Sequence, residues 1–202
     1  MRIGIFGGTF DPIHLGHLIL ADQCREQCEL DEVWFVPAAI PPHKQATVIS
    51  PAATRCAMIE LAISGYPAFR LARLELDRSG PSYTVTTLEQ LHGDDPSREL
   101  FLLLGADSIR DLPSWREPQR VLELATVVAV NRGRDIFDLP AVKQHLKAEL
   151  GNVSAHLQVV QIPGIDISAT DIRRRVTEGR SIRYLVPRAV EAYIHENSVY
   201  RT

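Results

Sequence analysis

The sequence has few of the features that mark disulfide scaffolds, membrane spans and nucleic-acid binders. It holds three cysteines, and no further Cys or His pair near Cys24 and Cys28 completes a zinc set. No stretch approaches the roughly 18 consecutive apolar residues of a transmembrane helix. The 22 Lys and Arg residues face 25 Asp and Glu residues, so the net charge of -3 gives no electrostatic footprint for nucleic acid. We therefore expect reduced thiols in or at the edge of the core, and neither a membrane nor a nucleic-acid partner.

Two common nucleotide-binding motifs are also missing. The absence of G-x-x-x-x-G-K-[ST] argues against a P-loop kinase, and the absence of G-x-G-x-x-G argues against a dehydrogenase. The N-terminus leads directly into an apolar run at Ile3 and leaves no room for a signal peptide, so we expect a cytoplasmic protein. The 202 residues, 45% hydrophobic and 23% charged, suit a single domain over residues 1–202 with a sizeable core.

The order of apolar runs and helical patterns predicts the fold class. We expect an α/β protein with a Rossmann-like, doubly wound, mostly parallel sheet, flanking helices and a small C-terminal helical part from about residue 180 to 202. The predicted strands span residues 3–6, 32–37, 69–77 (at an edge), 99–104, 126–130 and 157–162. The first predicted helix follows His17, and the second runs from the Ser50 cap to about residue 64. Further helices are predicted over residues 85–92 and 139–150, from the Ser168 cap onward, and through residues 193–195.

The stretch Gly-Gly-Thr-Phe-Asp-Pro-Ile-His-Leu-Gly-His, residues 7–17, follows the first predicted strand. Gly7 and Gly8 lack side chains, so their backbone can approach a ligand closely. The first turn of the following helix offers unpaired N–H groups and a positive dipole end. This combination of a strand, a glycine loop and a helix start predicts a phosphate-binding site.

The spacing of His14 and His17 places both imidazoles on one face of the helix start, with Gly16 keeping the turn thin. Two such donors suit the charge that builds up on a phosphoryl group in its transition state. A metal site and a solvated helix start remain alternatives for an isolated pair of this kind.

A second candidate phosphate site lies near the C-terminus. Ser168 is a good N-cap, with Asp171 placed as in a capping box and Gly179 placed as the residue that ends the helix. The hydroxyls of Ser168 and Thr170 and the guanidinium of Arg173, one turn later, can also bind phosphate. Arg174 and Arg175 point elsewhere on the helix and are expected to be solvated.

Both motifs match one known group of proteins. Residues 7–17 resemble the signature of the HxGH nucleotidyltransferase superfamily, and Ile-Ser-x-Thr-x-x-Arg at 167–173 matches its second signature, with Ala169 where many members have Ser. The doubled glycine resembles the bacterial nicotinate-nucleotide adenylyltransferases in particular. The two motifs lie in the right order about 150 residues apart, so the resemblance covers essentially the whole chain.

The resemblance implies adenylyl transfer from ATP, with Mg²⁺, to nicotinate mononucleotide, giving deamido-NAD and pyrophosphate. It implies catalytic roles for His14, His17, Lys44 and Arg173. The ATP-binding residues it implies are Gly7, Gly8, Thr9, Phe10, His14, Gly16, His17, Ile167, Ser168, Thr170 and Arg173. Those it implies for the nicotinate nucleotide are Lys44, Tyr83, Thr84, Gly105, Asp107, Trp115 and Arg132.

Several of these residues have plainer roles when considered alone. Lys44 suits an exposed surface lysine, Thr84 and Asp107 suit helix caps, and Trp115 suits surface packing as well as stacking on a planar ligand. The rival functions are a pantetheine-phosphate adenylyltransferase, a nicotinamide-mononucleotide adenylyltransferase, and a nucleotide sensor without catalysis. The sequence sets no oligomeric state and is compatible with a homo-oligomer.

Overall fold

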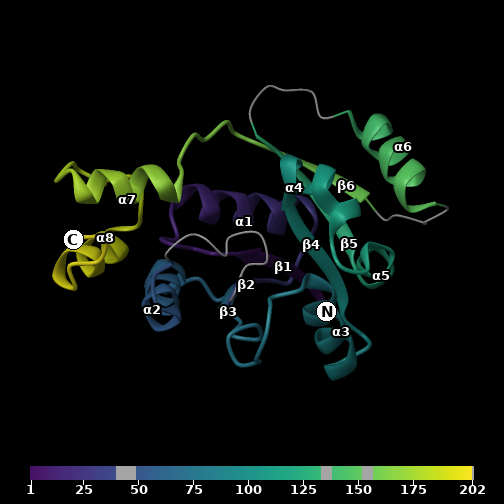
Figure 1. Ribbon diagram of the computed structural model, residues 1–202, viewed down its shortest axis with the longest axis horizontal. Coiled ribbons are helices and arrows are strands. Elements are labelled where there is room, and N and C mark those ends of the chain that lie inside the picture. The colour runs from purple at the N-terminus through teal and green to yellow at the C-terminus, as the bar shows by residue number, and fades with distance from the viewer. Residues whose placement is uncertain (40–48, 133–137, 152–156, 202) are drawn as a thin grey trace.

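The computed structural model describes residues 1–39, 49–132, 138–151 and 157–201. Its strands are β1 (Arg2–Gly8), β2 (Glu32–Pro37), β3 (Phe69–Leu71), β4 (Glu99–Gly105), β5 (Thr126–Arg132) and β6 (Leu157–Ile162). Its helices are α1 (Leu15–Gln27), α2 (Ala52–Ile63), α3 (Thr84–Asp94), α4 (Ala106–Asp111), the 3₁₀ helix η1 (Leu112–Ser114), α5 (Pro118–Leu124), α6 (Leu139–Leu150), α7 (Ala169–Thr177) and α8 (Arg188–Glu196). Helices thus alternate with strands along the chain, as the sequence predicts (Figure 1).

The strands form one sheet in the order β3-β2-β1-β4-β5-β6, and all neighbouring strands in it are parallel. The predicted doubly wound α/β fold is therefore confirmed. The strand order reverses between β1 and β4, and ligands of such sheets bind beyond the carboxyl ends of the strands at that point. The glycine loop after β1 and the Gly105 segment after β4 both lie there.

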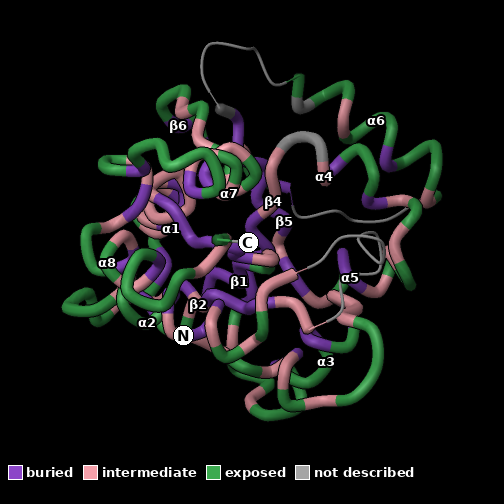
Figure 2. Tube along the Cα trace, turned by 60° about the vertical axis from the view of Figure 1, so that its left-hand side comes forward, coloured by how far each residue is buried: buried purple, intermediate pink, exposed green. Residues whose placement is uncertain are grey.

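Side chains alternate between the two faces of the sheet because successive strand residues point in opposite directions. In β4, Leu100 and Leu102 belong to the core shared with α3, α5 and α6, while Phe101 and Leu103 belong to the core shared with α1 and α2. Helices therefore cover both faces, and the strands are buried between them (Figure 2). Within the described ranges, no helix is long and apolar enough to cross a membrane.

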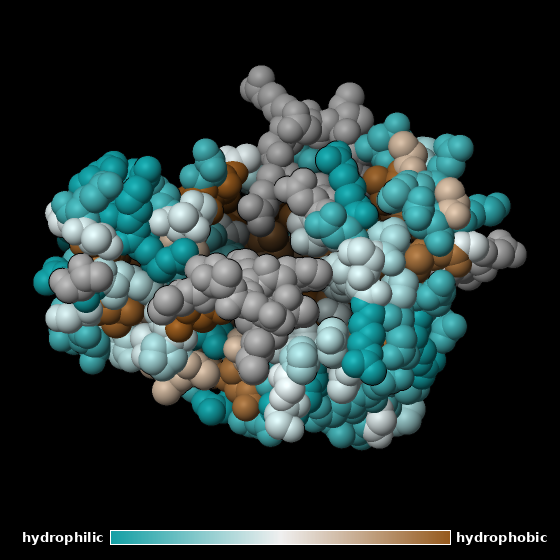
Figure 3. Space-filling view, in the orientation of Figure 1, coloured by the Kyte–Doolittle hydropathy of each residue, from teal (hydrophilic) through white to brown (hydrophobic). Residues whose placement is uncertain are grey.

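The C-terminal segment packs on the face of the sheet that α1 covers. Ile172 and Val176 of α7, with Val190 and Ile194 of α8, lie in the same apolar core as α1 and α2. Figure 1 shows α7 and α8 at one end of the molecule beside α2, and α6 at the opposite end. On the side of the molecule that Figure 3 shows, apolar residues are visible in the hollowed middle between two largely hydrophilic ends.

The edge strand is shorter than predicted. β3 ends at Leu71, and residues 73–77 form a turn in which the N–H groups of Leu76 and Asp77 donate to the carbonyl of Arg73. The apolar spacing changes from two residues to three after Leu71, and this change of phase marks the turn. The prediction of a strand over residues 69–77 was therefore wrong after its third residue.

The start of α2 also differs from the prediction. Its N-cap is Pro51 and not Ser50. The N–H of Ser50 donates to Asp11 Oδ2 at 3.0 Å, and the carbonyl of Ser50 accepts from Arg55 Nε at 3.0 Å. Ser50 thus holds the chain against the loop after β1 instead of capping the helix.

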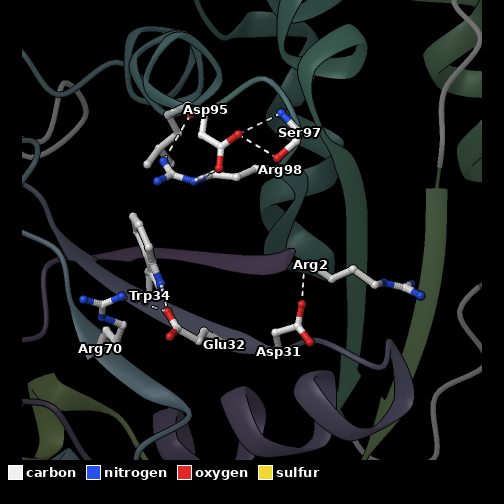
Figure 4. A network of polar contacts seen from close by, with 9 residues as sticks. Arg2, Asp31, Glu32, Trp34, Arg70, Asp95, Ser97 and Arg98 are labelled. Atoms are coloured by element: carbon white, nitrogen blue, oxygen red, sulfur yellow. Dashed lines mark hydrogen bonds and ion pairs between the residues drawn. The ribbon is translucent and has the colours of Figure 1, made fainter.

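A polar network stabilises the opposite end of β1 and β2 (Figure 4). The backbone N–H of Arg2 donates to Asp31 Oδ2 at 2.7 Å, and the indole of Trp34 donates to Glu32 Oε2 at 2.6 Å. The guanidinium groups of Arg70 and Arg98 each lie 5.4 Å from the Trp34 ring centroid, so they make cation–π contacts with it. Because these contacts lie at the amino ends of the strands, they serve stability and not the site.

Candidate functional site

The two histidines of the first motif form a compact pair. His14 is the N-cap of α1 and is 5% exposed, and its ring stacks on that of His17 with centroids 3.6 Å apart and an interplanar angle of 18°. The backbone N–H of His14 donates to His17 Nδ1 at 3.2 Å. A neutral imidazole has one donor and one acceptor nitrogen, so this bond keeps the ring proton of His17 on Nε2. His17 therefore presents Nε2 as a donor.

The glycines of the motif make room for aromatic rings. A Cβ on Gly16 would lie 3.2 Å from Cε1 and Nδ1 of His14, and a Cβ on Gly8 would lie 2.9 Å from Cζ of Phe10. A Cβ on Gly7 would meet no atom within 4 Å, so only the Gly7 backbone has open space beside it. The expected close approach of a ligand to the loop thus fits Gly7, while Gly8 and Gly16 serve packing within the protein.

Phe10 folds its own ring under the loop. Its φ of 50° lies in the left-handed region, which a bulky residue adopts only where its surroundings impose it. The ring is buried and packs edge-on against Phe6 and His17, with centroids 5.4 and 5.1 Å away. The Phe10 ring, next to Thr9 in the chain, therefore supports His17 from within the core.

The first turn of α1 offers fewer N–H groups than the sequence predicts. The N–H of Leu15 donates to the carbonyl of Leu185 at 3.0 Å, and the N–H of His17 donates to the carbonyl of His14 at 2.9 Å. The C-terminal segment thus supplies the acceptor for Leu15, and the start of the helix itself supplies the acceptor for His17. The expectation of unpaired N–H groups was therefore wrong for these two residues.

The second motif begins α7. The Ser168 hydroxyl caps the helix by accepting the N–H of Asp171 at 3.2 Å, and the half-buried Ile167 packs on the core just before it. Gly179, at φ 67°, donates to the carbonyl of Val176 and ends the helix as predicted.

The sequence suggested that the two arginines after Arg173 are merely solvated, but the structure shows both in ion pairs. Arg174 and Arg175 both bind the carboxylate of Asp171. Hydrogen bonds from Arg175 and Arg174 hold the pKa of Asp171 below its ordinary value. Asp171 therefore belongs to an ion-pair cluster of α7.

Arg173 joins the two motifs. Its Nη1 donates to the backbone carbonyl of Asp11 at 2.7 Å, across 162 residues of sequence, and its Nη2 donates to Thr170 Oγ1 at 3.4 Å. The guanidinium therefore lies beside the loop that leads to His14. Two histidines, an arginine and a hydroxyl from the ends of two helices thus surround the same loop, and this arrangement suits a triphosphate.

Asp11 is the residue that sequence reasoning missed. It is 4% exposed, and its Oδ1 accepts the hydroxyl of Tyr200 at 2.6 Å while its Oδ2 accepts the N–H of Ser50. The buried Arg55 lies beside it and donates from Nη1 to the carbonyl of Thr9 at 2.9 Å. Burial lowers the pKa of Arg55, and the nearby Asp11 charge partly offsets this effect. A carboxylate inside an anion-binding motif was the signal that could have revealed such partners.

The residues expected to bind the nicotinate nucleotide lie at several element ends. Tyr83 is the N-cap of α3 and Thr84 its first residue, while the half-buried Trp115 follows η1 and packs against the core under α3 and α5. The guanidinium of Arg116 lies 4.8 Å from the Tyr83 ring centroid. Thr84 is thus not the cap of α3, and Trp115 has a core-facing side in addition to its exposed one.

The remaining predicted residues follow the strands. Gly105 ends β4 and is the N-cap of α4, so Asp107 lies inside that helix and does not cap it. Arg132 ends β5. The side chains of Asp107 and Arg132, and the whole of Lys44, lie outside what the structure describes.

Comparisons with known proteins show the family of the chain. A family model described as cytidylyltransferase-like matches residues 5–175. A "Probable nicotinate-nucleotide adenylyltransferase" of Thermomicrobium roseum is 47% identical over 202 residues, covering 100% of this chain and 92% of the relative. A protein of the same name from Thermus thermophilus is 49% identical over 204 residues, covering 100% of this chain and 100% of the relative. The chain belongs to the nicotinate-nucleotide adenylyltransferase family.

Solved structures share the fold of this adenylyltransferase. "Plasmodium falciparum nicotinic acid mononucleotide adenylyltransferase complexed with NaAD" aligns with a TM-score of 0.80 at 21% identity, over 98% of this chain and 97% of that one. The same Plasmodium falciparum enzyme "complexed with APC" aligns with a TM-score of 0.79 at 21% identity, over 98% and 96% of the two chains. At this identity the likeness establishes the fold of the adenylyltransferase.

Proposed function

We propose that this adenylyltransferase makes deamido-NAD and pyrophosphate from ATP and nicotinate mononucleotide, a step of NAD biosynthesis. A phosphate oxygen of the mononucleotide attacks the α-phosphorus of ATP in line. The bond from the α-phosphorus to the bridging oxygen breaks, and the electron pair leaves with pyrophosphate. The chemistry needs no nucleophile from the protein, so catalysis consists of positioning and charge stabilisation.

The hydrogen bond from Arg173 to Asp11 is the observation that supports this assignment most directly, because it brings both phosphate motifs to one loop. His17 donates from Nε2 to the reacting phosphate, and His14, stacked on it, fixes its orientation and contributes a second imidazole. Arg173 binds the leaving pyrophosphate, with Ser168 and Thr170 beside it. Lys44 is proposed to bind the leaving pyrophosphate together with Arg173.

Mg²⁺ is proposed to arrive with ATP. Among the residues described, no group of three or more His, Cys, Asp or Glu side chains could hold a metal ion. The donors around the loop are imidazoles, hydroxyls and a guanidinium, which suit phosphate oxygens and not a dedicated Mg²⁺ cage. Mg²⁺ commonly binds through substrate phosphates. When bound, it would neutralise charge on the leaving pyrophosphate.

The acceptor site is proposed to lie at the start of α3 and beside η1. Tyr83 and Trp115 pack there on the same core, Thr84 follows Tyr83 as the first residue of α3, and the exposed Arg116 lies against the Tyr83 ring. The Trp115 ring offers a face for the pyridine, and the start of α3 offers N–H groups for its carboxylate. Gly105, Asp107 and Arg132 are proposed to contact the mononucleotide from the ends of β4 and β5. We propose a cytoplasmic location, as the start of the sequence predicts.

Pyrophosphate release with ATP and Mg²⁺ tests the proposal when nicotinate mononucleotide, nicotinamide mononucleotide and phosphopantetheine are offered in parallel. We expect strong preference for nicotinate mononucleotide. Turnover with another acceptor alone would keep adenylyl transfer but overturn the acceptor site. Binding of ATP without turnover on any acceptor would favour a nucleotide sensor.

A further inference from the structure

The last described residues of the chain return to the loop after β1, which carries Asp11. After α8 the chain curls through two residues in the left-handed region, Ser198 at φ 51° and Tyr200 at φ 67°. The N–H of Val199 donates to the carbonyl of Ile194 at 2.9 Å, and Thr177 Oγ1 of α7 donates to the carbonyl of Tyr200 at 3.1 Å. Non-glycine residues keep such backbone angles only where the surrounding structure holds them. The tail is therefore shaped to place Tyr200.

The Tyr200 hydroxyl donates to a carboxylate that already accepts a second hydrogen bond. It donates to Asp11 Oδ1 at 2.6 Å, while Asp11 Oδ2 accepts the N–H of Ser50 at 3.0 Å. Burial and the Asp11 carboxylate raise the pKa of Tyr200 far above its ordinary value, so the phenol stays a donor. Each oxygen of this buried carboxylate thus has its own hydrogen-bond donor, which restrains the orientation of the group.

Asp11 is also linked to both Arg173 and His14. The backbone carbonyl of Asp11 accepts Arg173 Nη1 at 2.7 Å, and His14 follows Asp11 by three residues. A shift of the Asp11 backbone would move the acceptor of Arg173 and the start of α1 together. A displacement of such groups by about 1 Å is enough to lower catalytic rates markedly.

We propose that Tyr200 is a positioning residue for adenylyl transfer, which acts through Asp11 to hold Arg173 and His14 in register with the triphosphate. This inference rests on the proposed function. The role belongs to the ATP side of the site, because Asp11 and Arg173 lie on the loop after β1 and on α7, away from the elements that carry Thr84 and Trp115. If the C-terminal tail had only a structural role, a change in it would alter the kinetic constants for both substrates equally.

The test compares Tyr200→Phe with Tyr193→Phe in the full chain. Both changes remove one phenol hydroxyl from the C-terminal segment and keep the ring, and both rings pack on the same core, but only Tyr200 bonds Asp11. For Tyr200→Phe we expect kcat/KM for ATP to fall about tenfold, as loss of a hydrogen bond to a charged group suggests, with KM for nicotinate mononucleotide within about twofold of the wild type. Tyr193→Phe should match the wild type.

A double-mutant cycle identifies the route of the effect. If Tyr200 acts through Asp11, Tyr200→Phe should have no further effect in an Asp11→Ala background. Equal losses in both backgrounds, or activity of Tyr200→Phe equal to that of Tyr193→Phe, would overturn the proposal. So would a loss that disappears once activity is divided by the folded fraction, obtained from thermal unfolding of each variant.

Calorimetric binding of a non-hydrolysable ATP analogue separates this inference from the proposed function. A wild-type chain that turns over none of the acceptors overturns the function. Weaker analogue binding by Tyr200→Phe than by Tyr193→Phe would then still support the positioning role, and equal affinities would overturn it.

Discussion

The ring of His14 stacks on the ring of His17 at 3.6 Å, and the backbone of the first residue donates to Nδ1 of the second. The pair is thus a single rigid unit at the start of α1, oriented by the helix itself. Phe10 and Phe6 enclose the outer side of His17. A donor held in this way needs little reorganisation when charge develops on a phosphate.

Replacement of His17 by Ala should lower kcat by about 10² to 10³, because one transition-state donor is lost. KM for both substrates should change much less. Steady-state pyrophosphate release measures both constants, and His92→Ala, at an exposed position of α3, serves as the control. An equally large change in KM for ATP would mean that His17 binds the ground state.

Gly16→Ala should lower kcat by about tenfold, since the new Cβ would lie 3.2 Å from His14 and displace its ring. The matched change is Gly93→Ala in α3, where a Cβ meets nothing within 4 Å. That variant should gain up to about 1 kcal/mol in the free energy of unfolding and keep its kcat. Kinetics and urea unfolding of the two variants check both expectations, and an unchanged kcat for Gly16→Ala would show that the His14 ring adapts.

Trp115→Ala should raise KM for nicotinate mononucleotide roughly tenfold and leave KM for ATP unchanged, because stacking on a planar ring contributes about 1–3 kcal/mol. Trp115→Phe keeps an aromatic face and should fall between this variant and the wild type. The measurement is the KM of each substrate at saturation of the other. Parallel changes in both KM values would instead assign Trp115 to packing.

The stability that Asp171 contributes should depend on pH. Its pKa is lowered from 3.8 by hydrogen bonds from Arg175 and Arg174, so its pairing stabilises the folded state above pH 3.8 and is lost as the pH falls through the folded value. Urea unfolding should show Asp171→Asn less stable than the wild type at pH 7 and equal to it in stronger acid. Asp166→Asn, at an exposed position before α7, is the control. A difference that is the same at every pH would exclude the ion pairs as its cause.

All three cysteines should resist alkylation in the folded protein. Burial raises the pKa of Cys24 to about 12 and also raises the pKa of Cys28 and Cys56, while only the thiolate reacts. Mass spectrometry after iodoacetamide treatment at pH 8 should find no adduct on the native chain and three adducts in urea. Rapid labelling of a native thiol would reveal local opening of α1 or α2.

The sequence alone determined the class of fold and the family of the chain. The strands at 32–37 and 157–162 and the helix at 139–150 have the predicted bounds, because apolar periodicity is a local property. The phosphate motifs could be identified because a glycine loop, two histidines and a capped helix with an arginine need their spacing and little else.

Only the tertiary structure decided how these motifs are held together. The bond from Tyr200 to Asp11 joins residues 189 positions apart, and no periodic pattern encodes such a partner. For the same reason Ser50 looked like a helix cap while it binds Asp11, and Arg55 gave no sign of its burial under the loop. A buried polar group must find a partner wherever the fold brings one near, and the folded chain determines that partner.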